Sequence, residues 1–188
     1  RSASSDISPE KLAADASRIF IILSLMAGLS SIALFLIMQN LKLSFFYSAS
    51  ASVLYIFSPA YIAAGGADFA HSFFFMFFFS FFCLFLVYCF KSRGQWWSLL
   101  AMSVFFYASL SAWTGASIIF AAIGIWELWR VFYGAPLNLR RKKIYISLVL
   151  VFLIAACLPF LPEQHELIHS PLIILLPALI SALFIYSL

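Results

Sequence analysis

Long apolar runs alternate with short polar segments along almost the whole chain. Seven such runs follow one another, at 18–38, 45–64, 72–90, 97–113, 115–132, 144–162 and 171–188. An α-helix needs about 20 apolar residues to cross the hydrocarbon core of a bilayer. The pattern therefore predicts an all-α chain, a polytopic transmembrane helical bundle with about seven spans.

The polar start of the chain predicts a tail before the first span. Residues 1–17 contain Ser8-Pro9-Glu10, a helix-start pattern with serine as the N-cap and proline in the first turn. We expect a short interfacial helix in this tail, followed by a transmembrane domain over 18–188. Because the chain begins at Arg1 rather than methionine, we interpret it as a fragment of a larger chain.

Composition supports the membrane interpretation. The chain is 65% hydrophobic and 10% charged, whereas soluble domains are about half apolar and a quarter charged. The three cysteines lie inside apolar runs and match no common metal or disulfide pattern, so we interpret them as apolar fillers. The net charge of +4 would suit nucleic acid, but the placement of the charges explains them better, so no nucleic-acid partner is expected.

The charges divide between the two faces that seven spans would create. Eight of the eleven basic residues fall in the loops at 39–44, 91–97 and 130–143, whereas six of the seven acids fall in the other loops and the tail. Cytoplasmic loops are enriched in lysine and arginine, so the basic loops are predicted to be cytoplasmic. The opposite face would be lumenal in the endoplasmic reticulum, or periplasmic in a bacterium. The basic run 140–143 is interpreted as an orientation signal, with binding of acidic lipid headgroups as the alternative.

Two further patterns predict helix packing. The runs 48–52 and 108–112 consist mainly of small residues, which form contact faces between membrane helices. The run 72–90 carries eight phenylalanines between Phe73 and Phe82 and has few polar groups on any side. We therefore expect much of this third helix to face lipid.

The break between the second and third runs holds the first candidate for chemistry. Pro59 and the pair Gly65-Gly66 interrupt the helix, and Asp68 and His71 follow at the expected membrane edge. A carboxylate there is costly and is a candidate functional residue. Asp68 as the N-cap of the Phe-rich helix is an equally open interpretation, and both roles can coexist.

Other polar residues are expected on the same face as Asp68. These are Trp113, Glu163, His165, Glu166 and His169. Carboxylates and imidazoles that converge there could hold a divalent metal, or they could be ordinary loop residues. The segment 165–169 also matches the H-E-x-x-H pattern of zinc peptidases, although Pro162 and Pro171 leave room for only a short helix around it.

The order of these features resembles the catalytic subunit of oligosaccharyltransferase, a membrane glycosyltransferase of the GT-C class. Residues 18–42 look like the span that follows the family's large first lumenal loop. The segment 59–68, with Pro59-Ala60-Tyr61-Ile62 and then Gly66-Ala67-Asp68, is similar to the family's Pro-Gly-Tyr-Ile and Gly-Ser-Tyr-Asp-Asn-Glu. The segment 111–115 looks like Ser-Ala-Trp-Gly-Gly, and 159–169 resembles the Pro-Phe and Ser-Glu-His of the loop that closes over the acceptor peptide.

The resemblance implies a GT-C-like fold and transfer of a glycan from a polyprenyl-linked carrier to asparagine of an acceptor polypeptide. Asp68 would bind a divalent cation, Mn²⁺ or Mg²⁺, and Glu163 or Glu166 would contact the acceptor side. Trp113, in the segment that resembles the family's tryptophan motif, would bind substrate. His71 matches no motif of the family and is predicted as a further polar contact to substrate. The implied partners are the lipid-linked oligosaccharide, the acceptor polypeptide, membrane lipids and other subunits of a membrane complex.

Two alternatives belong to other classes. In place of the family's second acid and of one glycine in its tryptophan motif, the chain has Ala70 and Thr114. These departures and the Phe-rich helix would suit a non-catalytic membrane subunit that packs in a larger complex. The second alternative is an H-E-x-x-H zinc membrane peptidase.

Overall fold

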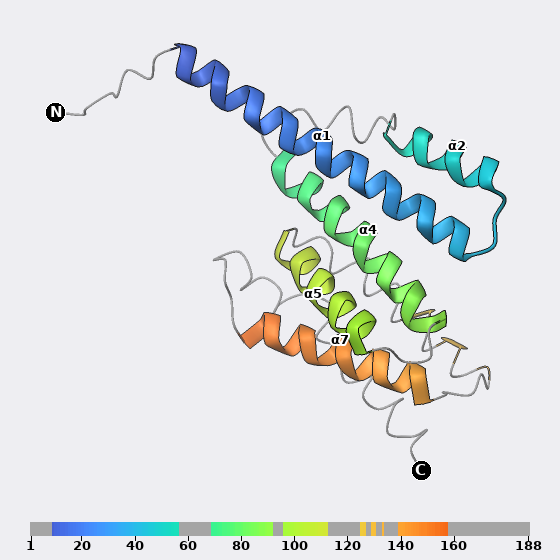
Figure 1. Ribbon diagram of the computed structural model, residues 1–188. Helices are drawn as coiled ribbons and strands as arrows, with labels where there is room; N and C mark the ends of the chain where they lie inside the picture. The colour runs from blue at the N-terminus through green and yellow to red at the C-terminus, as the bar shows by residue number, and fades with distance from the viewer. Residues whose placement is uncertain are drawn as a thin grey trace.

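The part of the chain that the structure describes is built from α-helices. The computed structural model describes residues 9–56, 69–91, 96–112, 125–126, 129–130, 133 and 139–157. Its longer elements are α1 (Pro9–Asn40), α2 (Phe45–Ile56), α4 (Phe69–Lys91), α5 (Trp96–Ala112) and α7 (Leu139–Cys157) (Figure 1). No strand occurs among these residues, which confirms the all-α prediction.

Two helices are long and apolar enough to cross a membrane. They are Ser17–Asn40, within α1, and Phe73–Lys91, within α4, while α2 and α5 are apolar but shorter. Only about a quarter of each long segment is buried, 22% and 28%, whereas the core helix of a soluble protein would be mostly buried. The described residues thus show two such helices. The expected runs 115–132 and 171–188 lie largely or wholly outside them.

Helix α1 begins at Pro9, as the helix-start pattern predicts. It continues without interruption to Asn40, so the interfacial helix expected in the tail forms the first turns of this 32-residue helix. The end is a Schellman motif, in which Lys42 N–H bonds to Gln39 O at 3.0 Å and Leu43 N–H to Met38 O at 3.1 Å. Lys42 takes the left-handed conformation this motif requires, with φ of 65°. The motif turns the chain sharply toward α2.

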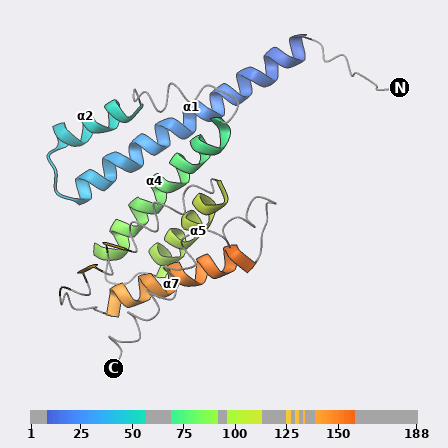
Figure 2. The same ribbon diagram turned by 180° about the vertical axis from the view of Figure 1, so that it is seen from behind.

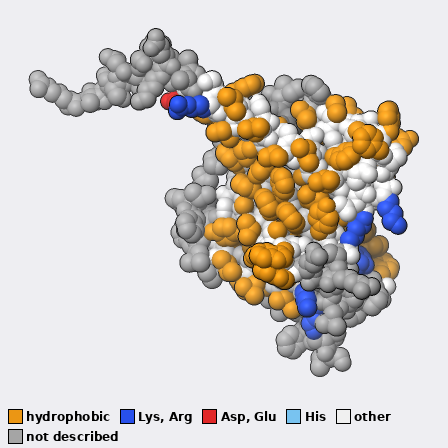
Figure 3. Space-filling model, viewed as in Figure 1, with side chains coloured by type: hydrophobic (Ala, Val, Ile, Leu, Met, Phe, Trp, Pro, Cys, Tyr) orange, Lys and Arg blue, Asp and Glu red, His pale blue; other side chains and the backbone are white. Residues whose placement is uncertain are grey.

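The contact between α1 and α2 is made by polar and small side chains. Ser31 Oγ donates to the carbonyl oxygen of Ser52 at 2.8 Å, and Gln39 Nε2 donates to Ser48 Oγ at 3.0 Å. All three serines are buried, while leucines, isoleucines and phenylalanines cover the outward faces of both helices (Figure 3). Hydroxyl groups inside and apolar groups outside are typical of helices that pack in lipid. The prediction that 48–52 is a contact face is confirmed.

Helix α4 lies at the centre of the described bundle, between α1 on one side and α5 and α7 on the other (Figures 1 and 2). Its phenylalanines meet α5, where the Phe105 ring centroid lies 5.1 Å from that of Phe81 and 5.5 Å from that of Phe85. Among the large apolar side chains described on α4, Phe74 alone is exposed. Most of the other side chains are partly exposed, and 28% of the apolar segment is buried. The expectation that much of this helix faces lipid therefore stays a prediction, although α1 and α5 cover parts of its surface.

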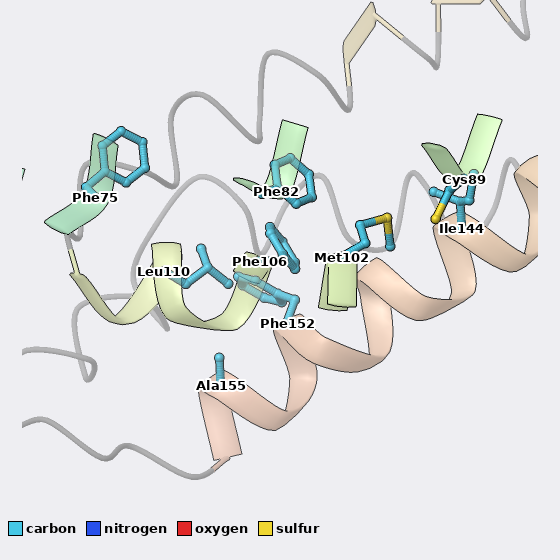
Figure 4. Packing of buried hydrophobic residues seen from close by; sticks show 9 residues of the cluster. All are labelled: Phe75, Phe82, Cys89, Met102, Phe106, Leu110, Ile144, Phe152 and Ala155. Carbon is cyan, nitrogen blue, oxygen red and sulfur yellow. The ribbon is translucent and has the colours of Figure 1, made fainter. Parts of the chain in front are cut away.

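Helices α4, α5 and α7 share one buried core, which contains Phe82, Met102, Phe106 and Phe152 (Figure 4). Ser109 and Leu110 on α5 are also fully buried, which confirms the packing role of 108–112. A polar contact accompanies the apolar core, because Ser103 Oγ and Ser147 Oγ lie 2.7 Å apart across α5 and α7. Apolar and hydroxyl contacts together hold the three helices in place.

Replacing Phe82 with alanine is expected to destabilise the folded chain by about 2–3 kcal/mol. Phe82 is 1% exposed, and its ring centroid lies 5.4 Å from that of Phe106. The expected loss is smaller than in a soluble core, because lipid is itself apolar and what remains is the cavity and its lost dispersion contacts. Unfolding of the detergent-solubilised chain would measure the change. The matched variant Phe74→Ala, on the exposed side of the same helix, should change stability by less than about 0.5 kcal/mol. Equal losses in both variants would contradict the central position of α4.

Candidate functional site

Most of the predicted site residues lie outside the described residues. This holds for Asp68, Trp113, Glu163 and Glu166, and also for the H-E-x-x-H segment 165–169. His71 lies in the first turn of α4, but its side chain is not among those described. The roles assigned to these residues stay predictions, and the structure constrains them only through the helix ends beside them.

Those helix ends lie at one end of the bundle. Helix α4 begins at Phe69, directly after Asp68, and α5 ends at Ala112, directly before Trp113. Helix α7 ends at Cys157, in the segment that leads toward Glu163. In both views the start of α4 and the ends of α5 and α7 lie on the same side (Figures 1 and 2). The alternation of spans predicted a shared face for the candidate residues, and the helix ends next to them in the sequence lie on one side of the bundle.

Packing holds these three ends together. Phe75 in the second turn of α4, Leu110 in the last turn of α5 and Ala155 in the last turn of α7 all belong to the shared buried core. They lie on the same side of the close-up, away from Cys89 and Ile144 at its other side (Figure 4). The helices that lead to Asp68 and Trp113 are therefore fixed relative to each other by their side chains.

The described residues contain no group of three or more histidine, cysteine, aspartate or glutamate side chains that could hold a metal ion. The one acid whose side chain is described, Asp15, lies exposed on α1, with its Oδ1 3.9 Å from Arg18 Nη1. An exposed pair of this kind contributes little to stability.

The opposite end of the bundle is basic. Helices α1 and α4 end there and α7 begins there, which places residues 41–43, Lys91 and 141–143 at that end (Figure 1). Blue side chains gather at this end in the space-filling view, and a second group lies beside the N-terminal tail (Figure 3). Among the described residues, the parts of the basic loops that were predicted to lie on one face do lie together at this end of the bundle.

Sequence reasoning missed how this basic end is assembled. Arg141 Cζ lies 5.7 Å from the centroid of the Phe90 ring, so the start of α7 contacts the end of α4. The Cys89 side chain hydrogen-bonds to Ser98, which ties the start of α5 to the same place. The run of four cations at 140–143 was the available signal, but linear spacing does not show which helix end it would meet.

Comparison of the chain with protein families, with known proteins and with solved structures finds no match.

Proposed function

We propose that this chain is the membrane-embedded part of an oligosaccharyltransferase-like enzyme, which transfers a glycan from a polyprenyl-pyrophosphate carrier to asparagine of acceptor proteins. The proposal combines the four ordered stretches of resemblance with one structural observation. The helix ends beside Asp68 and Trp113 lie together, opposite the basic end. An enzyme that binds a lipid-linked donor at one membrane face needs its site residues gathered on that face. The endoplasmic reticulum lumen, or the periplasm, is the compartment this proposal assigns to that face.

The chemistry assigned to the site follows from its residue types. Carboxylate oxygen is the ligand that Mg²⁺ and Mn²⁺ prefer, so the Asp68 side chain fits a divalent cation. Such a cation supplies positive charge beside the pyrophosphate that leaves. Asp68 would hold the pyrophosphate end of the donor in place through it, and Glu163 or Glu166 would contact the acceptor side. In the proposed step the acceptor amide nitrogen would form a bond to the anomeric carbon, the bond from that carbon to the pyrophosphate oxygen would break with its electron pair on the pyrophosphate, and the amide proton would pass to water.

The second candidate function is a non-catalytic membrane subunit. The observation in its favour is the apolar outward surface of α1 and α2, which includes Phe20, Leu25, Phe46 and Leu54, all more than 60% exposed. Lipid would cover this surface in a single-chain enzyme, and a neighbouring subunit would cover it in a complex. The two candidates differ in one testable respect, because only the enzyme requires Asp68.

Chelation of divalent cations is expected to abolish glycan transfer. Membranes that contain the full-length protein would be given a lipid-linked oligosaccharide and an Asn-x-Thr peptide, with and without chelator. Loss of a cation that neutralises a leaving group should slow transfer at least about a hundredfold. Added Mn²⁺ should restore it. A folded, full-length protein without transfer activity would favour the non-catalytic subunit instead.

A further inference from the structure

Basic side chains of the described residues are brought together where α4 ends and α7 begins. Helix α4 ends on Lys91, and residues 141–143 follow the first residues of α7. The guanidinium group of Arg141 lies over the Phe90 ring, with 5.7 Å from Cζ to the ring centroid, which is a cation–π contact. The cations therefore form one surface on two packed helix ends, and they are not scattered over separate loops.

The start of α7 concentrates positive charge. The N-terminus of a helix carries a partial positive charge, which favours a nearby anion. Three of the four residues in the first turn of α7, 139–142, are arginine or lysine, and Lys143 follows them. An anion at this surface would be attracted both by the helix N-terminus and by these cations.

Aromatic side chains beside the basic surface indicate where that anion would come from. Trp96 and Trp97 at the start of α5 are both exposed, with ring centroids 3.5 Å apart. Tryptophan is enriched at the level of lipid headgroups, where its ring contacts both apolar and polar groups. The adjoining helix α4 is also apolar and long enough to cross a bilayer. Cations and indoles at the end of such a helix suit a membrane surface better than a soluble anion.

We infer that Lys91 and residues 141–143, with Trp96 and Trp97 beside them, bind the phosphate groups of anionic lipids in the adjoining leaflet. The bound lipid headgroups also stabilise the contact of α7 with α4, because the same anionic surface attracts the cations of both helix ends. This inference concerns the basic end alone and does not rest on glycan transfer at the opposite end.

Binding of phosphatidylglycerol to the detergent-solubilised chain tests the inference. Phosphatidylglycerol would be titrated in while tryptophan fluorescence and the thermal midpoint are followed, with phosphatidylcholine as the uncharged comparison. Each lysine near an anionic membrane surface contributes roughly fivefold to binding, so the double variant K142Q/K143Q should bind phosphatidylglycerol about thirtyfold more weakly. Lys91→Gln, on the other helix, should weaken binding about fivefold. Raising the salt concentration should weaken binding by the parent chain as well.

The matched control is Arg18→Gln, which removes an exposed cation at the opposite end of the bundle. It should leave phosphatidylglycerol binding within about twofold of the parent value, because charges separated by more than about 10 Å are largely screened. Equal loss in Arg18→Gln and K142Q/K143Q would overturn the inference, since binding would then follow net charge alone. An equal thermal shift with phosphatidylcholine, or with inorganic phosphate at the same concentration, would also overturn it. So would tighter binding of a short RNA than of phosphatidylglycerol.

Discussion

Replacing Asp68 with alanine is expected to abolish glycan transfer while the helical bundle stays folded. The proposed role of this carboxylate is to hold the divalent cation that neutralises the leaving pyrophosphate, so its loss should cost at least about 3 kcal/mol of transition-state stabilisation. That corresponds to a rate at least about a hundredfold lower. The initial rate of transfer to an Asn-x-Thr peptide, normalised to folded protein in the membrane, is the measurement.

A second variant separates the cation role of Asp68 from its structural role. The residue directly precedes Phe69, the first residue of α4, and its interpretation as the N-cap of that helix is a prediction from the sequence. Asparagine caps a helix about as well as aspartate, whereas alanine costs about 1 kcal/mol. Asp68→Asn should therefore keep the thermal midpoint of the parent and still lose transfer.

The matched control for Asp68 is Asp15→Ala, which removes an exposed acid from α1. Its partner is Arg18 at 3.9 Å, and an exposed pair of this kind is worth at most about 1 kcal/mol. Transfer by Asp15→Ala should stay within about twofold of the parent rate, because this exposed acid on α1 is not among the residues assigned to the site. Normal transfer by Asp68→Asn at normal protein level would remove Asp68 from the catalytic site and favour the non-catalytic subunit.

The helices were predictable from the sequence because apolar length is a strong signal, although their ends follow other rules. The run expected from 45 begins at Phe45, and the run expected over 97–113 becomes Trp96–Ala112. Helix α7 begins at Leu139, ahead of the apolar run expected from 144. Backbone hydrogen bonding continues through the basic residues, whose long side chains can reach polar surroundings from inside a helix. Hydropathy marks the apolar part of a helix, and capping marks its end.

The packing direction of α4 was not predictable. With phenylalanine at most positions from 73 to 82, the helix has no polar face that would show which side turns outward. The structure decides this through partners distant in the chain, such as Phe105 against Phe81 and Phe85. The same limit applies to Ser103 with Ser147, since neither serine is distinguished by its sequence neighbours. For the candidate site, the structure places the neighbouring helix ends on one side of the bundle. The roles of its side chains rest on the sequence.

Replacing Leu29 with arginine is expected to prevent α1 from spanning the membrane. Leu29 lies near the middle of the apolar segment Ser17–Asn40, and its side chain is 44% exposed. Exchange of leucine for arginine at the centre of a spanning helix costs about 3–4 kcal/mol of insertion free energy. On the exposed face of a water-soluble helix the same exchange would change stability by less than about 0.5 kcal/mol. The size of the effect therefore distinguishes a helix in lipid from a helix in water.

Insertion of α1 can be measured in the full-length chain with a glycosylation tag in the N-terminal tail, which the predicted orientation places in the lumen. Leu29→Arg should reduce tag modification strongly. Ile19→Arg, at the edge of the segment beside Arg18, should reduce it much less, because an arginine near a helix end can extend its charged group to the interface. Equal modification of the parent, Leu29→Arg and Ile19→Arg would contradict a membrane-spanning α1. The apolar outer surface that α1 shares with α2 would then have to be covered by protein, and the basic end would lose its neighbouring lipid leaflet. Comparison of arginine at positions 29 and 19 therefore tests whether α1 spans a membrane. The lipid contacts proposed for the apolar outer surface and for the basic end both depend on this.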